Sequence, residues 1–129
     1  MIVTRINVFS DIIGAMNTMK LENLVYHLAD SSLEGYNGGQ WEFVETSCGA
    51  RYMRFPFKGE RTLSFQFNEA VAGFDAAGIA LTLMTLSHFS FHLYEKEDTD
   101  LEAVNKAFYK LLEYAGGHAQ AGQILAFID

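Results

Sequence analysis

The chain has 129 residues, 50% of them hydrophobic, and its 16 acidic and 9 basic residues give a net charge of −7 at pH 7. This length and composition predict one domain over residues 1–129 and exclude an intrinsically disordered chain. The negative charge argues against a protein that coats nucleic acid, because binding to phosphates requires a cationic surface.

Cysteine content and the N-terminal residues exclude further classes of protein. Cys48 is the only cysteine, so we expect no internal disulfide and no cysteine-based zinc site. Residues 1–19 lack the charged and apolar regions of a signal peptide. Residues 71–94 are weakly charged, but Asp75, His88 and His92 interrupt them, which favours a buried core helix over a membrane span. We therefore expect a soluble, cytoplasmic protein.

The first half of the chain predicts a helix followed by strands. A helix over residues 20–34 is predicted by apolar residues at positions i, i+3, i+4 and i+7, namely Leu21, Leu24, Val25 and Leu28. A weaker pattern of the same kind spans residues 9–16. The helix ends at residues 35–39, where Gly and Asn favour a turn.

Three short strands are predicted over residues 41–46, 52–57 and 62–67, because apolar and polar residues alternate there. Leu63, Phe65 and Phe67 would be the inward residues of the third strand. Pro56 has no N–H to donate, so the second strand ends early or lies at an edge. The short connections between the strands predict an antiparallel meander.

The remainder of the chain is predicted to be helical. Asp75 would cap a helix from Ala76 to about His92, which is apolar nearly all round and therefore buried. A helix near residues 101–115 stops at Gly116 and Gly117, and a short helix follows over about residues 119–128. The predicted fold class is α+β: a small antiparallel β-meander of three to four strands packed against several helices in a single compact domain.

His88 and His92 are the weak candidates for a metal site. Residues four apart on a helix can place two imidazoles on one metal ion. The segment lacks the glutamate of the zinc-hydrolase motif, however, and no third ligand is apparent. We favour the explanation that one histidine is hydrogen-bonded in the core and the other ends the helix, where its charge suits the dipole. A metal-dependent enzyme that uses this pair remains an alternative function.

Two other reactive side chains have simpler explanations. Ser87 and His88 are adjacent on a helix and point about 100° apart, so they do not form a catalytic pair. Cys48 lies in a predicted loop close to Arg51, which could lower the pKa of the thiol. We interpret Cys48 as a surface thiol.

Charged residues gather in two segments. The basic cluster consists of Arg51, Arg54, Lys58 and Arg61. We interpret it as a solvated strand face rather than a contact for an acidic partner. The acidic cluster consists of Glu95, Glu97, Asp98, Asp100 and Glu102. Mimicry of DNA needs carboxylates at the density of phosphates, about one per 1.7 Å of the B-DNA axis. Acids at a helix start also interact favourably with its dipole, and this is the explanation we favour.

Four segments carry a resemblance to a known family. The first, residues 36–43, has the pattern Tyr-x-Gly-Gly-x-Trp-acid-aromatic. The second spans residues 49–53, and the third comprises residues 75–79 and 86–91. The fourth contains Tyr109, Leu112, Tyr114, Ala115 and His118 and ends with residues 124–129. In this order and with these gaps, the segments resemble the plasmid antirestriction proteins of the ArdB/KlcA family, over about residues 26–129.

The resemblance implies a small protein encoded on a plasmid or other mobile element that protects incoming DNA. It would inhibit type I restriction–modification endonucleases without being an enzyme and without a cofactor. The implied partner is the type I enzyme or an associated host factor, with no direct binding to nucleic acid and no membrane. A domesticated relative that only folds and associates with other molecules remains a further alternative.

We predict that a partner-binding surface would include Tyr36, Trp41, Asp75 and Asp129. A tryptophan exposed beside a glycine turn can anchor a protein contact. The alternative for Trp41, which we favour, is that it packs in the core. Asp75 is first of all a helix cap, and Asp129 is first of all the end of the chain with two carboxylates.

Overall fold

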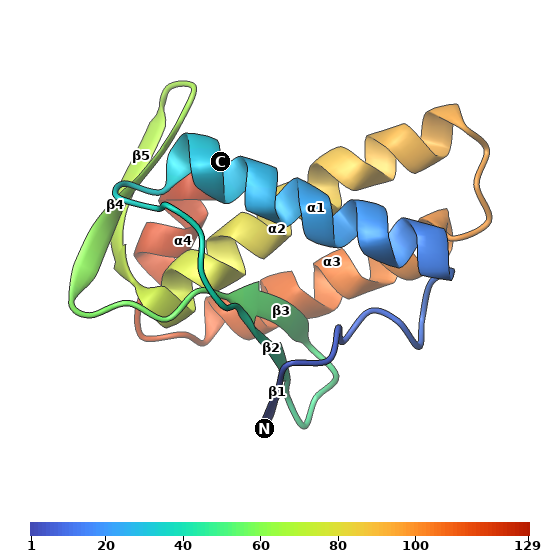
Figure 1. Ribbon diagram of the computed structural model, residues 1–129, viewed down its shortest axis with the longest axis horizontal. Coiled ribbons are helices and arrows are strands. Elements are labelled where there is room, and N and C mark those ends of the chain that lie inside the picture. The colour runs from blue at the N-terminus through green and yellow to red at the C-terminus, as the bar shows by residue number, and fades with distance from the viewer.

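Four helices and five short strands make up the computed structural model, which describes residues 1–129 (Figure 1). The helices are α1 (Ala15–Ser32), α2 (Phe74–Glu95), α3 (Leu101–Gly116) and α4 (Ala121–Ile128). The strands are β1 (Ile2–Thr4), β2 (Glu42–Glu45), β3 (Arg51–Arg54), β4 (Glu60–Phe65) and β5 (Asn68–Gly73). Helices packed against small antiparallel sheets confirm the predicted α+β class.

Helix α2 lies at the centre of the fold and contacts the other three helices as well as β3, β4 and β5. Every residue from Ala76 to Leu86 is buried. By length and composition α2 could cross a membrane, but 67% of its apolar window is buried inside the protein, as in the core helix of a soluble protein. The predicted core helix is therefore confirmed, and it extends to Glu95 rather than to His92.

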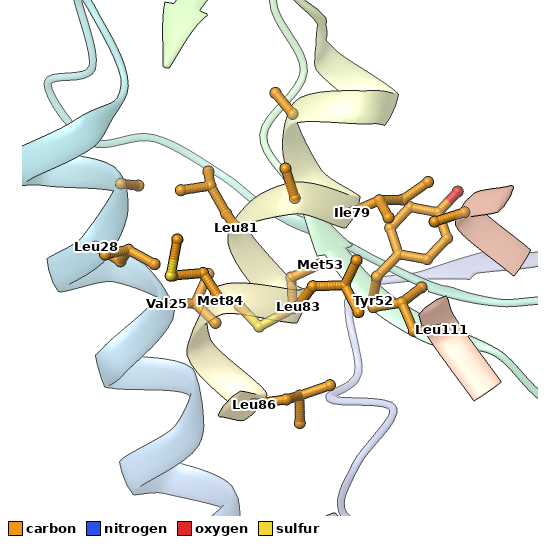
Figure 2. Packing of buried hydrophobic residues seen from close by; sticks show 14 of the residues in the cluster. Val25, Leu28, Tyr52, Met53, Ile79, Leu81, Leu83, Met84, Leu86 and Leu111 are labelled. Carbon is orange, nitrogen blue, oxygen red and sulfur yellow. The ribbon is translucent and has the colours of Figure 1, made fainter. Parts of the chain in front are cut away.

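The hydrophobic core is one cluster of 33 buried residues arranged around α2. Met84 faces Val25 of α1 on one side of α2, while Ile79 faces Tyr52 of β3 and Leu111 of α3 on the other (Figure 2). Burial of one large apolar side chain stabilises a fold by about 1.5–3 kcal/mol. Because residues on both sides of α2 contribute, this helix holds the strands and the outer helices together.

The strands divide between two sheets, whereas the sequence pattern predicted one meander. In the first sheet, β2 pairs antiparallel with both β1 and β3, with Phe43 opposite Met53. In the second, β4 pairs with β5, with Leu63 opposite Ala70, and a single bridge joins Leu63 to Leu33 after α1. The strand β3 ends at Arg54, before Pro56, and residues 55–59 carry the chain away from the first sheet.

The sequence pattern did not predict β1 or β5. Ala70 and Ala72 are buried and alternate with the exposed Glu69 and Val71, so β5 follows a strand period. Alanine has a weak strand propensity, which hides this signal. The prediction that Phe67 points inward is wrong, because this residue lies in the β4–β5 turn and its side chain is fully exposed.

Helix boundaries in the N-terminal part differ from the predicted ones. The segment 9–14 forms turns rather than a helix, and α1 begins at Ala15, five residues before the predicted start. The predicted stop of α3 at Gly116 and Gly117 is confirmed, as is the short C-terminal helix.

One edge of β3 pairs with β2, and the other edge pairs with no strand. Gly78 and Thr82 of α2 lie against this second edge. The hydroxyl of Thr82 accepts a hydrogen bond from the Met53 N–H at 3.0 Å and donates one to the Met53 carbonyl at 3.3 Å. One helical turn away, a Cβ on Gly78 would lie 2.5 Å from the Met53 carbonyl oxygen and 2.8 Å from the Cα of Arg54. The absence of a side chain at Gly78 therefore allows α2 to approach the strand closely enough for Thr82 to bond to it.

Replacement of Gly78 by alanine tests this close approach. We expect Gly78→Ala to lower the free energy of unfolding by about 1–3 kcal/mol, because the new methyl group overlaps backbone atoms that cannot move aside. The matched control is Gly122→Ala in α4, where a Cβ meets nothing within 4 Å. There, helix propensity alone predicts a gain of up to about 1 kcal/mol. Urea unfolding of the two variants measures both values, and equal stabilities would contradict the close approach.

Candidate functional site

Asp75 lies at the centre of a hydrogen-bonded cluster at the start of α2. Its Oδ1 accepts hydrogen bonds from the Tyr52 hydroxyl at 2.8 Å and from Arg54 Nη1 at 2.6 Å. Its Oδ2 lies 2.9 Å from Nε2 of His118. The prediction that Asp75 caps the helix is wrong: Gly73 is the N-cap, and the Asp75 carboxylate bonds to side chains of other elements rather than to the first amides of the helix. Stronger donors from β3 and from the α3–α4 connection hold the carboxylate instead.

The strand period places the two β3 residues of the cluster. Tyr52 and Arg54 are two apart and therefore point to the same face of the strand, toward the first turn of α2. Arg54 also donates from Nε to Glu42 on the neighbouring strand β2 at 2.7 Å. Its guanidinium thus joins two carboxylates that lie on separate elements.

The hydrogen bonds of His118 determine its tautomer. The Gln120 N–H donates to Nδ1 of His118 at 2.9 Å, so this nitrogen carries no proton. The Nε2 atom therefore carries a proton, and this N–H donates a hydrogen bond to Asp75. The Gln120 side chain accepts from the Gly73 N–H at 2.9 Å and donates to Glu60 at 2.8 Å. The α3–α4 connection is thus tied directly to the N-terminus of α2.

The cluster perturbs the pKa values of its own members. Burial alone would raise the pKa of Asp75, but the hydrogen bonds from Arg54, Tyr52 and His118 outweigh this and lower it. Burial, followed by the hydrogen bond to Asp75, raises the pKa of Tyr52. Burial would lower the pKa of Arg54, but its bonds to Asp75 and Glu42 raise it. At neutral pH the cluster therefore contains an ionised Asp75, a cationic Arg54 and a neutral Tyr52.

The hydrogen bonds of the Asp75 cluster are suited to holding α2, β3 and the α3–α4 connection together. Both carboxylate oxygens of Asp75 and both ring nitrogens of His118 are occupied by bonds within the protein. A cavity of about 610 Å³ lies beside His118. Its lining residues are Cys48, Lys110, Glu113, Tyr114, Gly117, His118 and Ala119. The cluster therefore forms part of the wall of an open, mixed polar and apolar recess.

Trp41 and Tyr36 form a second, aromatic group. Trp41 is 5% exposed, so the prediction of an exposed contact anchor is wrong and the alternative of core packing is confirmed. Its indole N–H donates to the Tyr36 hydroxyl at 3.0 Å, and its ring centroid lies 5.6–5.8 Å from those of Tyr26, Tyr36 and Phe55. Tyr36 is half-buried and lines a recess of about 460 Å³ with Asn37 and other residues.

Asp129 belongs neither to the Asp75 cluster nor to the aromatic group of Trp41 and Tyr36. Its main-chain carbonyl oxygen accepts a hydrogen bond from Asn68 Nδ2 at 3.0 Å, which ties the end of the chain to the start of β5. The structure therefore brings Tyr36 and Trp41 together but joins neither of them to Asp75 or Asp129 by a hydrogen bond. A role of the four residues in binding a partner stays a prediction.

Sequence analysis missed the partners of Asp75. Arg54 stood out as a member of the basic cluster, Tyr52 only as a residue of the predicted strand 52–57, and His118 only as part of the resemblance. The period of two indicated that Tyr52 and Arg54 share a face. No local pattern connects them with His118, which is 43 residues from Asp75.

The structure contains no group of three His, Cys, Asp or Glu side chains that could hold a metal ion, so His88 and His92 have no third ligand. The prediction of one core histidine is wrong, because both are exposed. The other part of that prediction is confirmed, since His92 lies in the last turn of α2. Their rings pack on neighbouring aromatic rings: His88 on Phe65 at 5.7 Å and His92 on Phe89 at 5.8 Å.

Cys48 is exposed, as predicted, but Arg51 does not control its pKa. The hydrogen bond from Thr46 lowers the pKa of the thiol, with Oγ1 3.1 Å from Sγ. Arg51 instead forms salt bridges with Asp11 at 3.3 Å and Glu45 at 3.5 Å.

Within the acidic cluster, Asp98 and Asp100 bind the start of α1. Asn17 Nδ2 donates to Asp98 at 3.0 Å and to Asp100 at 2.9 Å, and the Gly14 N–H donates to Asp100 at 2.9 Å. The hydrogen bond from Asn17 lowers the pKa of Asp98. These two acids therefore fasten the α2–α3 connection to α1.

Comparison with known proteins identifies relatives along the whole chain. A family model described as antirestriction protein matches residues 34–129. The chain is 33% identical to the uncharacterized protein YafX of Escherichia coli K12, over 97% of this chain and 82% of that protein. It is 29% identical to the antirestriction protein KlcA of Escherichia coli, over 88% and 78%.

A solved structure also matches the fold. It comes from the KlcA and ArdB proteins, which have a novel fold. These proteins show antirestriction activity against type I DNA restriction systems in vivo but not in vitro. The TM-score is 0.80 at 28% sequence identity, covering 99% of this chain and 94% of the other.

The lowered pKa of Asp75 predicts a pH-dependent contribution to stability. A lowered folded pKa means that the contribution is complete above the unfolded pKa, about 3.9, and is lost as pH falls through the folded value. We expect Asp75→Asn to lower the free energy of unfolding by about 2–3 kcal/mol at pH 7. The deficit should shrink as pH approaches 3, which urea unfolding at both pH values measures.

The matched control is Asp30→Asn, at an exposed position of α1. We expect this change to alter the free energy of unfolding by less than about 0.5 kcal/mol at either pH. A deficit of Asp75→Asn that is the same at pH 3 and pH 7 would contradict the role assigned to the ionised carboxylate.

Proposed function

Since the chain belongs to the antirestriction protein family, we propose that it protects incoming mobile DNA by inhibiting type I restriction–modification endonucleases. One observation carries this proposal: the fold matches that of KlcA and ArdB over 99% of the chain, and those proteins act against type I systems in vivo. The proposal places the chain in the cytoplasm, where incoming DNA meets the endonuclease.

We propose further that the inhibition is not enzymatic. In the Asp75 cluster, both ring nitrogens of His118 are bonded to Gln120 and Asp75, so no nucleophile is paired with this histidine. General-base catalysis needs the imidazole nitrogen to be within reach of the proton that it removes. These contacts support a structural role for the cluster rather than a catalytic one.

The partner would be a protein rather than DNA. The net charge of −7 repels phosphates. The arginines of the predicted basic cluster are engaged within the chain: Arg51 with Asp11 and Glu45, and Arg54 with Glu42 and Asp75. Arg61 lies over the ring of Phe57 at 4.6 Å. These pairings support a partner that is the type I enzyme or an associated host factor.

The plating of phage tests the proposed function. A host with an active type I system restricts unmodified phage, and soluble expression of the chain should raise the efficiency of plating toward that of modified phage. Modified phage on the same host is the control for effects on growth, and a host with a type II endonuclease tests selectivity. Unchanged plating of unmodified phage, with the chain soluble and folded, would exclude the proposed function.

A second test concerns the route of inhibition. Because the activity of KlcA and ArdB is seen in vivo but not in vitro, we expect the purified chain to leave a purified type I enzyme active. Addition of extract from cells without any restriction system should restore inhibition if a host factor takes part. DNA cleavage with and without the extract measures this, and inhibition of the purified enzyme alone would indicate direct binding.

A further inference from the structure

The ends of α2 and α3 form an apolar surface that no other part of the chain covers. A groove of about 300 Å³ lies between the two helices, here called the α2–α3 groove, and is lined by Ser90, Phe91, Tyr94, Leu101 and Asn105. Phe91 and Tyr94 are 68% and 71% exposed. Both helices reach this end of the molecule, on the right in Figure 1, where the α2–α3 connection protrudes from the body.

Helical spacing gathers the exposed rings on one face. Phe91 and Tyr94 are three apart and so share a face of α2. Tyr109 follows Asn105 by one turn of α3 and is 66% exposed, which extends the same side of the groove. Contiguous apolar surface that remains exposed marks a site of interaction, and here it is aromatic.

Free carboxylates flank the groove. Glu95 follows Phe91 by one turn of α2, and Glu102 precedes Asn105 by one turn of α3. Both are exposed, and neither takes part in any of the five salt bridges of the structure. Asp98 and Asp100, by contrast, are held by Asn17. The acidic cluster is therefore divided between two structural acids and others that face solvent.

Acids outnumber the nearby cations, since residues 95–106 contain five acidic residues and two lysines. Lys96 lies at the C-cap of α2, is exposed and forms no salt bridge. Lys106 lines a different recess, together with Gly49 and Arg51 of the β2–β3 hairpin. The rim of the groove at Glu95 and Glu102 thus keeps its negative charge.

We propose that the α2–α3 groove binds a basic amphipathic segment of a partner protein. An apolar side chain of that segment would enter between Phe91 and Leu101, and flanking lysines or arginines would meet Glu95 and Glu102. The same cations gain from the faces of Phe91 and Tyr94. Nucleic acid and anionic lipid do not fit, because the carboxylates repel their phosphates. The inference rests on the proposed function, since it states which kind of segment the inhibitor contacts.

A peptide-binding experiment tests the groove without any restriction enzyme. The probe is a fluorescent synthetic helical peptide in which leucines form one face and lysines the other, and the control peptide carries glutamates in place of the lysines. Fluorescence anisotropy should show saturable binding of the lysine peptide that weakens as salt is added, and much weaker binding of the glutamate peptide.

Paired variants separate the groove from the general negative charge. We expect Phe91→Ser with Tyr94→Ser to weaken binding about tenfold, whereas Phe67→Ser, at the fully exposed tip of the β4–β5 hairpin, should not change it. Glu95→Gln with Glu102→Gln should weaken binding and reduce its salt dependence. Asp30→Asn with Glu34→Gln changes the net charge by the same amount at exposed positions elsewhere and should have little effect. Circular dichroism checks that each variant is folded.

The outcomes distinguish this inference from the proposed function. Equal binding by the groove variants and their matched controls, or equal binding of the two peptides, would overturn the groove as a specific site. Groove variants that lose the peptide but still protect unmodified phage would also overturn it, since the partner then binds elsewhere. The inference is supported if the groove variants lose both peptide binding and phage protection while their matched controls keep both. If the unaltered chain does not protect phage, the proposed function fails, and peptide binding still decides whether the groove is a binding site.

Discussion

The contact between α2 and the uncovered edge of β3 determines the arrangement of the other elements. The Thr82 hydroxyl is hydrogen-bonded to both the N–H and the C=O of Met53. Gly78 has no side chain, so the helix can lie close to the strand. An uncovered strand edge invites pairing with other chains. Here a helix closes that edge instead, and the same helix contacts α1, α3 and α4. A short sheet and three helices thereby share one core.

The Asp75 cluster extends this contact to the C-terminal part of the chain. Asp75 stands one turn before the close approach at Gly78, so its carboxylate meets Tyr52 and Arg54 of the same strand. His118 brings the α3–α4 connection to the same carboxylate. A partly buried charge of this kind stabilises a fold only while all of its partners are in place. The cluster therefore favours one orientation of α4 over others.

Residue patterns predicted the features that depend on local periodicity. The apolar character of α2, the alternation in β2 and β3 and the glycines after α3 gave the right elements. Features that depend on distant residues were not predictable in this way. Nothing near Asp75 indicates His118, and the helix-cap prediction did not consider competition from the Arg54 guanidinium. Trp41 was ambiguous because a glycine turn precedes it, and Tyr26 and Phe55, which bury it, come from distant parts of the chain.

Arg51 and Arg54 each pair with carboxylates of the same chain, which affects how the protein encounters other macromolecules. With these cations paired to carboxylates of the same chain, the net charge of −7 determines the sign of the long-range field. Such a field slows diffusional encounters with polyanions and speeds those with cationic surfaces, most strongly at low ionic strength. Among other macromolecules, a chain with this charge would spend little time on DNA and more on cationic protein surfaces.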